Sequence, residues 1–191
     1  MEISLIILTS YLLGSIPFGF LLTKIILKKD IREIGSGNIG ATNVLRTGNK
    51  IIGYSTLILD ILKAVIPILF IKIQFPEFIF ISSLAVFLGH VFPIWLKFNG
   101  GKGVATYVGI LFCINYILGF FFIATWLVVF FISKYSSLSS LLASFIIPIY
   151  YFFIDTENYY FFIIMFILIF YTHRENIKRL KNNTESKTKI Y

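Results

Sequence analysis

Long runs of apolar residues, separated by short polar segments, dominate the pattern of this chain. The runs lie at 3–27, 51–73, 78–96, 104–132, 138–154 and 159–172. Because a helix needs about 20 largely apolar residues to cross a bilayer, these runs predict membrane-spanning helices. The fourth run is long enough for one tilted helix, or for two short helices that turn near Asn115 and Gly119.

The positions of the basic residues favour two helices in the fourth run. With that division the chain has seven spans, and 15 of its 17 Lys and Arg residues fall in segments on one side. A single fourth helix would place Lys134 and the basic tail on the opposite side from the other cations. Positively charged segments favour the cytoplasm. The sequence therefore predicts an all-α integral membrane protein with seven transmembrane helices, its N-terminus outside and its C-terminus cytoplasmic.

The first run is not typical of a cleaved signal peptide. Glu2 stands where a basic region is usual, the run is too long, and the basic residues follow it. We therefore expect an uncleaved first helix. No repeat or linker is visible, so we predict one membrane domain over 1–191. Its polar motif segments are 28–50, 97–103, 134–140 and 173–191.

Composition excludes a soluble protein and narrows the chemistry. Hydrophobic residues make up 58% of the chain and charged residues 14%, whereas soluble domains have about 25% charged residues. The net charge of +8 would suggest nucleic acid in a soluble protein, but here it favours anionic lipid or a phosphorylated substrate. One cysteine, Cys113, and two histidines give no basis for a disulfide framework or a metal site. We expect no metal and no nucleic-acid partner.

The segment 28–50 has the composition of a phosphate-binding loop. Glycines alternate with hydroxyl and amide side chains, and an arginine follows. Such glycines let backbone N–H groups converge on an anion, and arginine can hold a phosphate with two hydrogen bonds. The alternative is a flexible turn between two helices. The candidate residues are Gly35, Ser36, Gly37, Asn38, Gly40, Thr42, Asn43 and Arg46.

The segment 97–103 repeats this theme immediately before a predicted helix. Gly100, Gly101 and Gly103 surround Lys102. Backbone amides at a helix N-terminus, with a lysine beside them, predict a second anion site. The alternative is a basic turn at the membrane surface. The nearby His90 is either a packed histidine or a proton donor or acceptor near the site.

Three further features are less specific. Ser137 and Ser140 provide hydroxyl groups where the sixth span begins, although serines there are more often helix caps. His173 and Asn176 share one helical face if the last span continues, although a basic tail on anionic lipid is the simpler explanation. Within the second span, a carboxylate and a lysine three residues apart can pair, for structure or for function.

Taken together, the motifs resemble those of a known family. The strings GSGNIGATN, GHVFPIWLKFNGGKGVAT and HRENIKRL begin at residues 35, 89 and 173, and they are similar to the signatures of bacterial acyl-phosphate:glycerol-3-phosphate acyltransferases. The pair Asp60 and Lys63 lies between the first and second strings, which is also the order in the family. The resemblance implies a seven-span enzyme of the bacterial inner membrane, with its active site on the cytoplasmic face. It also implies acyl transfer from acyl phosphate to position 1 of glycerol 3-phosphate, which gives lysophosphatidic acid and phosphate in the first acylation of phospholipid synthesis.

The resemblance also implies roles for individual residues. The implied catalytic residues are Ser36, Arg46, Lys102, His173 and Asn176. The implied substrate-binding residues are Gly35, Gly37, Asn38, Gly40, Thr42, Asn43, Gly100, Gly101, Gly103, Ser137, Ser140 and Glu185. No metal, cofactor or obligatory protein partner is implied; the partners are the two substrates and membrane lipid. Asn183 and Ala64 stand where the family usually has glycine.

Two questions stay open at this level. The proton of the attacking hydroxyl could go to His90, to His173 or to a substrate phosphate, and we favour the phosphate. A membrane transporter of a phosphorylated metabolite is the alternative function, because basic glycine-rich segments also suit anion passage. No repeated half of the transporter kind is visible, however.

Overall fold

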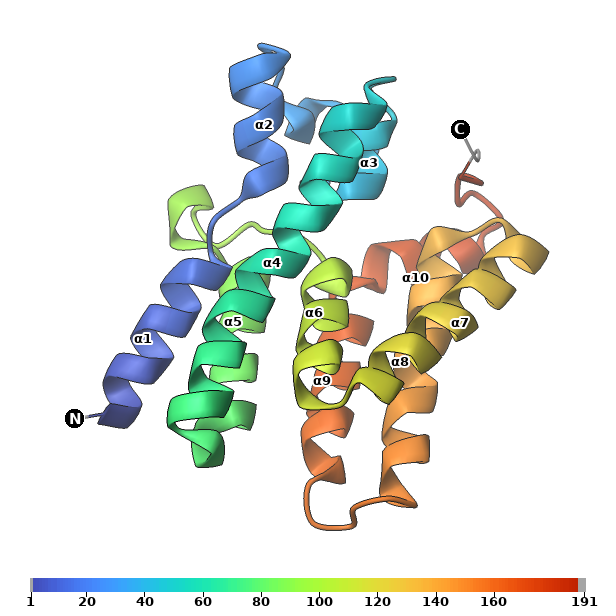
Figure 1. The fold of residues 1–191 in the computed structure, drawn as a ribbon. Coiled ribbons are helices and arrows are strands. Elements are labelled where there is room, and N and C mark those ends of the chain that lie inside the picture. The colour runs from blue at the N-terminus through green and yellow to red at the C-terminus, as the bar shows by residue number, and fades with distance from the viewer. Residues whose placement is uncertain (1, 189–191) are drawn as a thin grey trace. The chain divides into compact units, whose positions relative to one another are not determined.

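The computed structural model describes residues 2–188, and this part of the chain contains helices and connecting segments but no strand (Figure 1). The all-helical prediction is therefore confirmed. The α-helices are α1 (Glu2–Gly14), α2 (Phe18–Ile26), α3 (Ala41–Leu45), α4 (Lys50–Gln74), α5 (Ile79–Val91), α6 (Val104–Ile114), α7 (Tyr116–Ser133), α8 (Ser136–Phe152), α9 (Tyr159–Thr172) and α10 (Arg174–Lys181). Single 3₁₀ turns lie at Ile31–Glu33, Pro76–Phe78 and Ile94–Leu96.

Several of these helices have the length and apolarity that a bilayer requires. Within the described residues, three helical stretches are long and apolar enough to cross a membrane: Glu2–Ile26, Pro76–Leu96 and Tyr116–Ser133. Three shorter helices are also apolar: Val104–Ile114, Ser136–Phe152 and Tyr159–Thr172. Much of the apolar surface is exposed; Ile132 on α7, for example, is 81% exposed. A lipid environment accounts for that exposure, because apolar side chains there need no protein cover.

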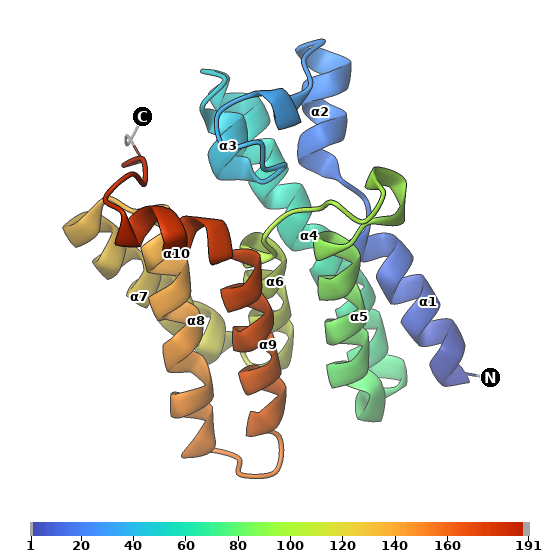
Figure 2. The same ribbon diagram turned by 180° about the vertical axis from the view of Figure 1, so that it is seen from behind.

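The chain divides into two compact units, one up to Ile114 and one from Asn115 onward. In the first unit α1 packs along α5, α4 contacts both α5 and α6, and α3 lies on α4 (Figure 1). In the second unit α8 packs against both α7 and α9 (Figure 2). One membrane domain over 1–191 stays a prediction.

The first apolar run is interrupted, which corrects the expectation of one continuous helix. Pro17 follows Ile16 at the break between α1 and α2, and proline lacks the N–H that a helix needs. The carbonyl of Ile16 instead accepts a hydrogen bond from Lys63 Nζ at 2.8 Å. The Ser15 hydroxyl accepts one from Trp95 Nε1 at 2.9 Å. Side chains from other helices therefore satisfy polar groups at a break within an apolar segment.

The fourth apolar run is divided at Asn115, which confirms the predicted break. The Asn115 side chain caps α7 by accepting a hydrogen bond from the Ile117 N–H at 2.9 Å. On the other side of the break, Lys72 Nζ donates to the carbonyl of Cys113 at 2.6 Å, near the end of α6. These contacts satisfy the backbone groups that a helix end leaves without intrahelical partners.

Candidate active site

The buried side chain of Asn43 organises the first glycine-rich segment. Its Nδ2 group lies 2.8 Å from the Asn38 carbonyl, 2.9 Å from the Ile34 carbonyl and 3.2 Å from the Ile31 carbonyl. Its Oδ1 atom accepts a hydrogen bond from the Ser36 N–H at 2.9 Å. Asn43 is 3% exposed, so it holds the loop together from within. The structure therefore shows a structural role for Asn43 within the loop, and the substrate contact that the resemblance implies stays a prediction.

Most amides of this loop donate within the protein. The Gly37 N–H donates to the Ile34 carbonyl, and the Gly40 N–H donates to the Asn38 side chain. Together with the Ser36 amide, they are not available to form the backbone anion cradle that composition suggested. Gly35 and Gly37 instead provide positive φ angles of 57° and 70°, which other residues adopt only with strain.

The side chains of the same loop remain as candidates for anion binding. Ser36 is exposed, whereas Asn38, Thr42 and Arg46 are half-buried. A Cβ atom at Gly35 would meet both Asn43 and the side chain of Arg46. Glycine at position 35 therefore lets Arg46 lie directly against the loop, beside Ser36.

An apolar core beneath this loop joins it to the second glycine-rich segment. Leu96 lies in the 3₁₀ turn just before the second segment. It clusters with four residues of the loop, α3 and α4, which are Ile31, Ile39, Val44 and Ile52. All five side chains are buried, Ile31 and Val44 completely. Both segments are therefore fixed to one core in the first unit.

The second segment folds back onto the end of α5. The Gly100 N–H donates to the Val91 carbonyl at 3.0 Å, and the Gly101 N–H donates to the His90 carbonyl at 3.1 Å. A Cβ atom at Gly101 would overlap the imidazole of His90. These two glycines thus allow close packing, and their amides donate within the protein; the anion contact predicted for them stays a prediction. Half-buried Lys102 follows directly.

Gly103 has a positive φ angle of 82°, and α6 begins at the next residue. A Cβ atom at Gly103 would overlap the ring of Phe87 on α5. All three glycines of this segment therefore set the path of the backbone around Lys102.

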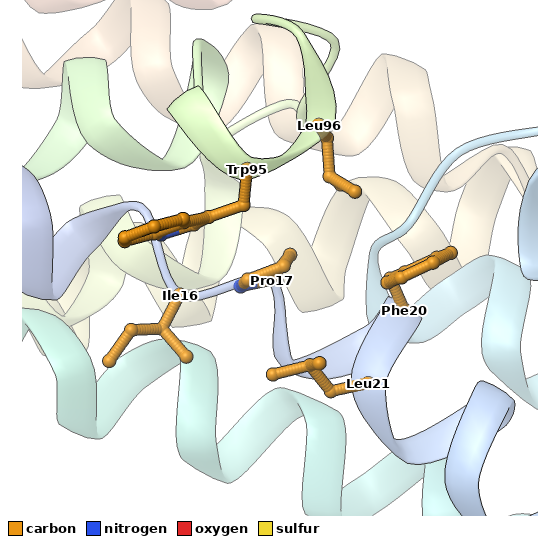
Figure 3. A pocket seen from close by; sticks show the side chains of 6 residues that line it. All are labelled: Ile16, Pro17, Phe20, Leu21, Trp95 and Leu96. Carbon is orange, nitrogen blue, oxygen red and sulfur yellow. The ribbon is translucent and has the colours of Figure 1, made fainter.

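An apolar cavity of about 370 Å³ lies beside this region of the first unit (Figure 3). Its lining residues come from the α1–α2 junction, from α2 and from the 3₁₀ turn at Ile94–Leu96. They are Ile16, Pro17, Phe20, Leu21, Trp95 and Leu96. The absence of charged groups among these residues suits an apolar guest and not a phosphate group.

In the second unit, the Glu185 carboxylate accepts hydrogen bonds from three side chains. Its Oε1 atom accepts hydrogen bonds from Ser137 Oγ at 2.7 Å and from Asn176 Nδ2 at 2.6 Å. Its Oε2 atom accepts one from Arg179 Nε at 2.7 Å. Burial alone would raise the pKa of Glu185, but the hydrogen bonds from Arg179, Asn176 and Ser137 outweigh it, so the pKa lies below its ordinary value.

Sequence reasoning missed Arg179 as a partner of Glu185. The available signal was its position on the basic last turn of the HRENIKRL string, whose helix α10 is amphipathic. Ser140 differs from its implied role, because its hydroxyl donates to the Ser136 carbonyl at 2.9 Å and accepts from Trp126 Nε1 at 3.0 Å. It therefore anchors α7 to α8.

The ring of His173 is held in one orientation. Its Nδ1 atom lies 2.8 Å from the Ile169 carbonyl, one turn back in α9, and the residue is 2% exposed. A carbonyl can only accept, so Nδ1 carries a proton. In the neutral ring, Nε2 is therefore the basic nitrogen. Among the described residues, no group of three His, Cys, Asp or Glu side chains could hold a metal ion.

Comparison with known proteins places these features in a family. A family model for glycerol-3-phosphate acyltransferase matches residues 4–183. The chain is 70% identical, over the whole length of both proteins, to a glycerol-3-phosphate acyltransferase of Pelagibacter ubique strain HTCC1062. It is 48% identical to that of Bradyrhizobium diazoefficiens strain USDA 110, over 93% of this chain and 90% of the relative.

Solved structures agree with this assignment. The fold is similar to a crystal structure of PlsY (YgiH), an integral membrane glycerol 3-phosphate acyltransferase, in its glycerol 3-phosphate form. The TM-score is 0.91 at 36% identity, over 98% of this chain and 96% of the other. The lysophosphatidic acid form of PlsY matches with a TM-score of 0.87 at 36% identity, over 98% and 95% of the two chains. The chain is an integral membrane protein that belongs to the glycerol-3-phosphate acyltransferase family.

Proposed function

We propose that this protein transfers a fatty acyl group from acyl phosphate to position 1 of glycerol 3-phosphate. The products are lysophosphatidic acid and inorganic phosphate. The observation that carries the proposal is the match, over 98% of the chain, to PlsY structures in a glycerol 3-phosphate form and a lysophosphatidic acid form. Acyl phosphate as donor rests on the resemblance of the three motif strings.

The chemistry requires orientation and charge stabilisation more than a strong base. The glycerol hydroxyl oxygen attacks the acyl carbon, a new ester C–O bond forms, and the bond from the acyl carbon to the phosphate oxygen breaks. Phosphate is already a good leaving group, so the gain comes from holding two anions in the right geometry. Arg46 and Lys102 are the cations that we assign to the phosphate groups, with Ser36, Asn38 and Thr42 as further hydrogen-bond donors.

From the second unit, we assign His173 and Asn176 to the reaction and regard Ser137 and Glu185 as the groups that position Asn176. The hydrogen bond from His173 Nδ1 to the Ile169 carbonyl makes Nε2 the nitrogen that can accept a proton when the ring is neutral. A leaving phosphate can also take the hydroxyl proton. We favour the phosphate, because it lies at the reacting bond in every turnover.

The proposed setting is the bacterial inner membrane with seven spans, the N-terminus outside and the motif segments in the cytoplasm. The division of the fourth run at Asn115 supports that count, with α1 and α2 as one interrupted span. The acyl chain would then lie against apolar surface such as the cavity of Figure 3. No obligatory protein partner is proposed.

Purified protein in detergent, incubated with acyl phosphate and radiolabelled glycerol 3-phosphate, tests the proposal. We expect labelled lysophosphatidic acid and an equal amount of released phosphate. Acyl thioesters supplied in place of acyl phosphate test the choice of donor. A transporter would instead accumulate label inside proteoliposomes without forming lysophosphatidic acid, and that result would refute the proposal.

A further inference from the structure

A buried ion pair on α4 has no part in the reaction described above. Asp60 Oδ1 and Lys63 Nζ are 2.8 Å apart, and their side chains are 3% and 2% exposed. Burying two charges is costly, and an apolar pair of similar size is often at least as stable. Ionisable residues in a membrane helix are therefore candidates for a functional role.

Lys63 connects this pair to the interruption of the first span. Its Nζ atom donates to the Ile16 carbonyl at 2.8 Å, and the same atom lies 5.9 Å from the centre of the Phe18 ring. Because Pro17 interrupts the helix here, the lysine takes the place of a helical N–H. One ammonium group thus holds α4 to the α1–α2 junction.

Asp60 reaches both sides of the glycine segment that carries Lys102. Its main-chain carbonyl accepts a hydrogen bond from Thr106 Oγ1 at 3.3 Å, in the first turn of α6 after that segment. Its side-chain Oδ1 atom lies 3.8 Å from Nδ1 of His90, at the end of α5 before the segment. One residue before Lys102 in the chain, His90, and one residue after it, Thr106, therefore both approach Asp60.

His90 lies between Asp60 and the backbone of the segment 97–103. It is 4% exposed, and among the described residues its Nδ1 atom has no hydrogen-bond partner. Its carbonyl accepts the Gly101 N–H, and its imidazole occupies the space that a side chain at Gly101 would need. The His90 ring therefore lies directly against the backbone next to Lys102.

We propose that Lys63 and Asp60 are positioning residues, which act through His90 to set the place of Lys102 during acyl transfer. This inference rests on the proposed function, because it takes Lys102 as a phosphate-binding group. A displacement of about 1 Å in a catalytic group can cost up to about 100-fold in rate. A purely structural pair would leave the turnover unchanged once it was replaced by a well-packed apolar pair.

The double variant Asp60→Leu/Lys63→Met separates the two roles. We expect its melting temperature in detergent to fall no further than that of Lys72→Met, because the apolar pair removes the cost of burying two charges and the Ile16 carbonyl still accepts a hydrogen bond from the Phe18 N–H. We expect kcat for lysophosphatidic acid formation to fall at least about tenfold, with the KM for glycerol 3-phosphate changed less than about threefold. Made in the Lys102→Met background, the same double substitution should change kcat less than about twofold, because the lysine that the pair positions is absent.

Lys72→Met is the matched control. Lys72 also lies on α4 and donates to a carbonyl, that of Cys113, but it is nine residues further along, about 13 Å at the rise of an α-helix. We expect it to lower the melting temperature and to leave kcat unchanged. If the double variant cannot be purified folded, the neutral polar pair Asp60→Asn/Lys63→Gln takes its place, with an expected loss of at least about threefold in kcat that disappears in the Lys102→Met background.

The outcomes distinguish the inference from the proposed function. If the wild type forms no lysophosphatidic acid, the proposed function fails, and the inference fails with it. If the wild type is active and the double variant keeps its kcat, only the positioning role is overturned. An equal loss of kcat with and without Lys102 would also overturn it.

Discussion

At the scale of single residues, the hydrogen-bond partners of the candidate side chains differ. Asn43 and Glu185 are polar and lie in motif segments, yet their hydrogen-bonding atoms are directed to loop carbonyls and neighbouring side chains. Ser36 and Arg46 are more accessible. The first pair should therefore affect both stability and activity when replaced, whereas the second pair should affect activity alone.

Replacing either proposed phosphate-binding cation tests that distinction. Arg46→Ala and Lys102→Ala should each reduce kcat/KM by a factor equivalent to about 2 kcal/mol or more, because charge-assisted hydrogen bonds to phosphate are strong in a partly dry site. Steady-state assays with acyl phosphate measure this. The matched controls are Arg32→Ala, which removes an arginine already paired with Asp30 at 2.6 Å, and exposed Lys97→Ala. Activity within threefold of wild type in either test variant would remove that residue from the site.

Asn43→Asp should destabilise the first loop. It replaces an amide donor that faces three carbonyls by a carboxylate that can only accept. Losing buried hydrogen bonds costs about 1–3 kcal/mol for each group left unsatisfied, so we expect the melting temperature to fall by about 5 °C or more and activity to fall with it. Thermal unfolding in detergent measures the change. Asn99→Asp, in an exposed turn, should unfold like the wild type.

The pKa of Glu185 predicts a pH-dependent attachment of the tail. Because this pKa is lowered in the folded protein, the ionised carboxylate adds stability above its unfolded pKa, and that stability is lost as the pH falls through the folded value. Hydrogen exchange in residues 182–188, corrected for intrinsic rates, should therefore speed up below about pH 4.

The Glu185→Gln variant should exchange faster already at pH 6 and lose the pH dependence. Glu175→Gln, which changes an exposed carboxylate on α10, should keep the wild-type profile. A wild-type tail whose protection does not change between pH 6 and pH 3 would contradict this role of Glu185.

At the scale of elements, side chains from elsewhere in the fold support both interruptions of apolar runs. The break after Ser15 is held by Lys63 and Trp95. The break at Asn115 is held by Lys72 and by the side chain of Asn115 itself. In an apolar environment a free backbone group costs several kcal/mol, so such breaks persist only where partners are supplied.

Asn115→Ala should therefore weaken the start of α7. Losing a helix N-cap costs about 1 kcal/mol, which corresponds to about 2–4 °C in the melting temperature of a chain of this size. Asn115→Ser, which can still accept from the Ile117 N–H, should keep the wild-type value. Equal melting temperatures for the two variants would show that the cap does not stabilise the break.

At the scale of the whole molecule, the apolar helices are those of an integral membrane protein, and most of its basic residues lie in the segments that connect or follow these helices. The basic segments include both glycine-rich loops and the tail after α9. The orientation of these segments toward the cytoplasm is the proposal with the widest consequences, because it decides which pool of substrate the enzyme uses.

Cysteine accessibility tests the orientation. In a Cys113→Ala background, which removes the chain's single cysteine, new cysteines at Tyr135 and at Asn38 should both resist a membrane-impermeant thiol reagent added to intact cells. Both should react after the cells are opened. A cysteine introduced at Glu77 should react in intact cells and serves as the control. Labelling of the Tyr135 position alone from outside would contradict the seven-span arrangement.

The sequence by itself determined the class of protein, the apolar helices apart from the break between α1 and α2, and the positions of the motifs. Apolar runs, the turn signal at Asn115 and the alternation of glycine with polar residues are local features, so they can be recognised without knowledge of contacts. The pairing of Asp60 with Lys63 was also predictable, because residues three apart share a helical face.

Only the tertiary structure decided which polar groups meet across long stretches of chain. Lys63 reaches a carbonyl 47 residues earlier, Trp95 reaches a hydroxyl 80 residues earlier, and Glu185 meets Ser137 from 48 residues away. The same holds for the glycines at 100 and 101, whose packing against the end of α5 only the tertiary structure shows. Local composition shows that a group can donate a hydrogen bond, but packing decides which acceptor it faces.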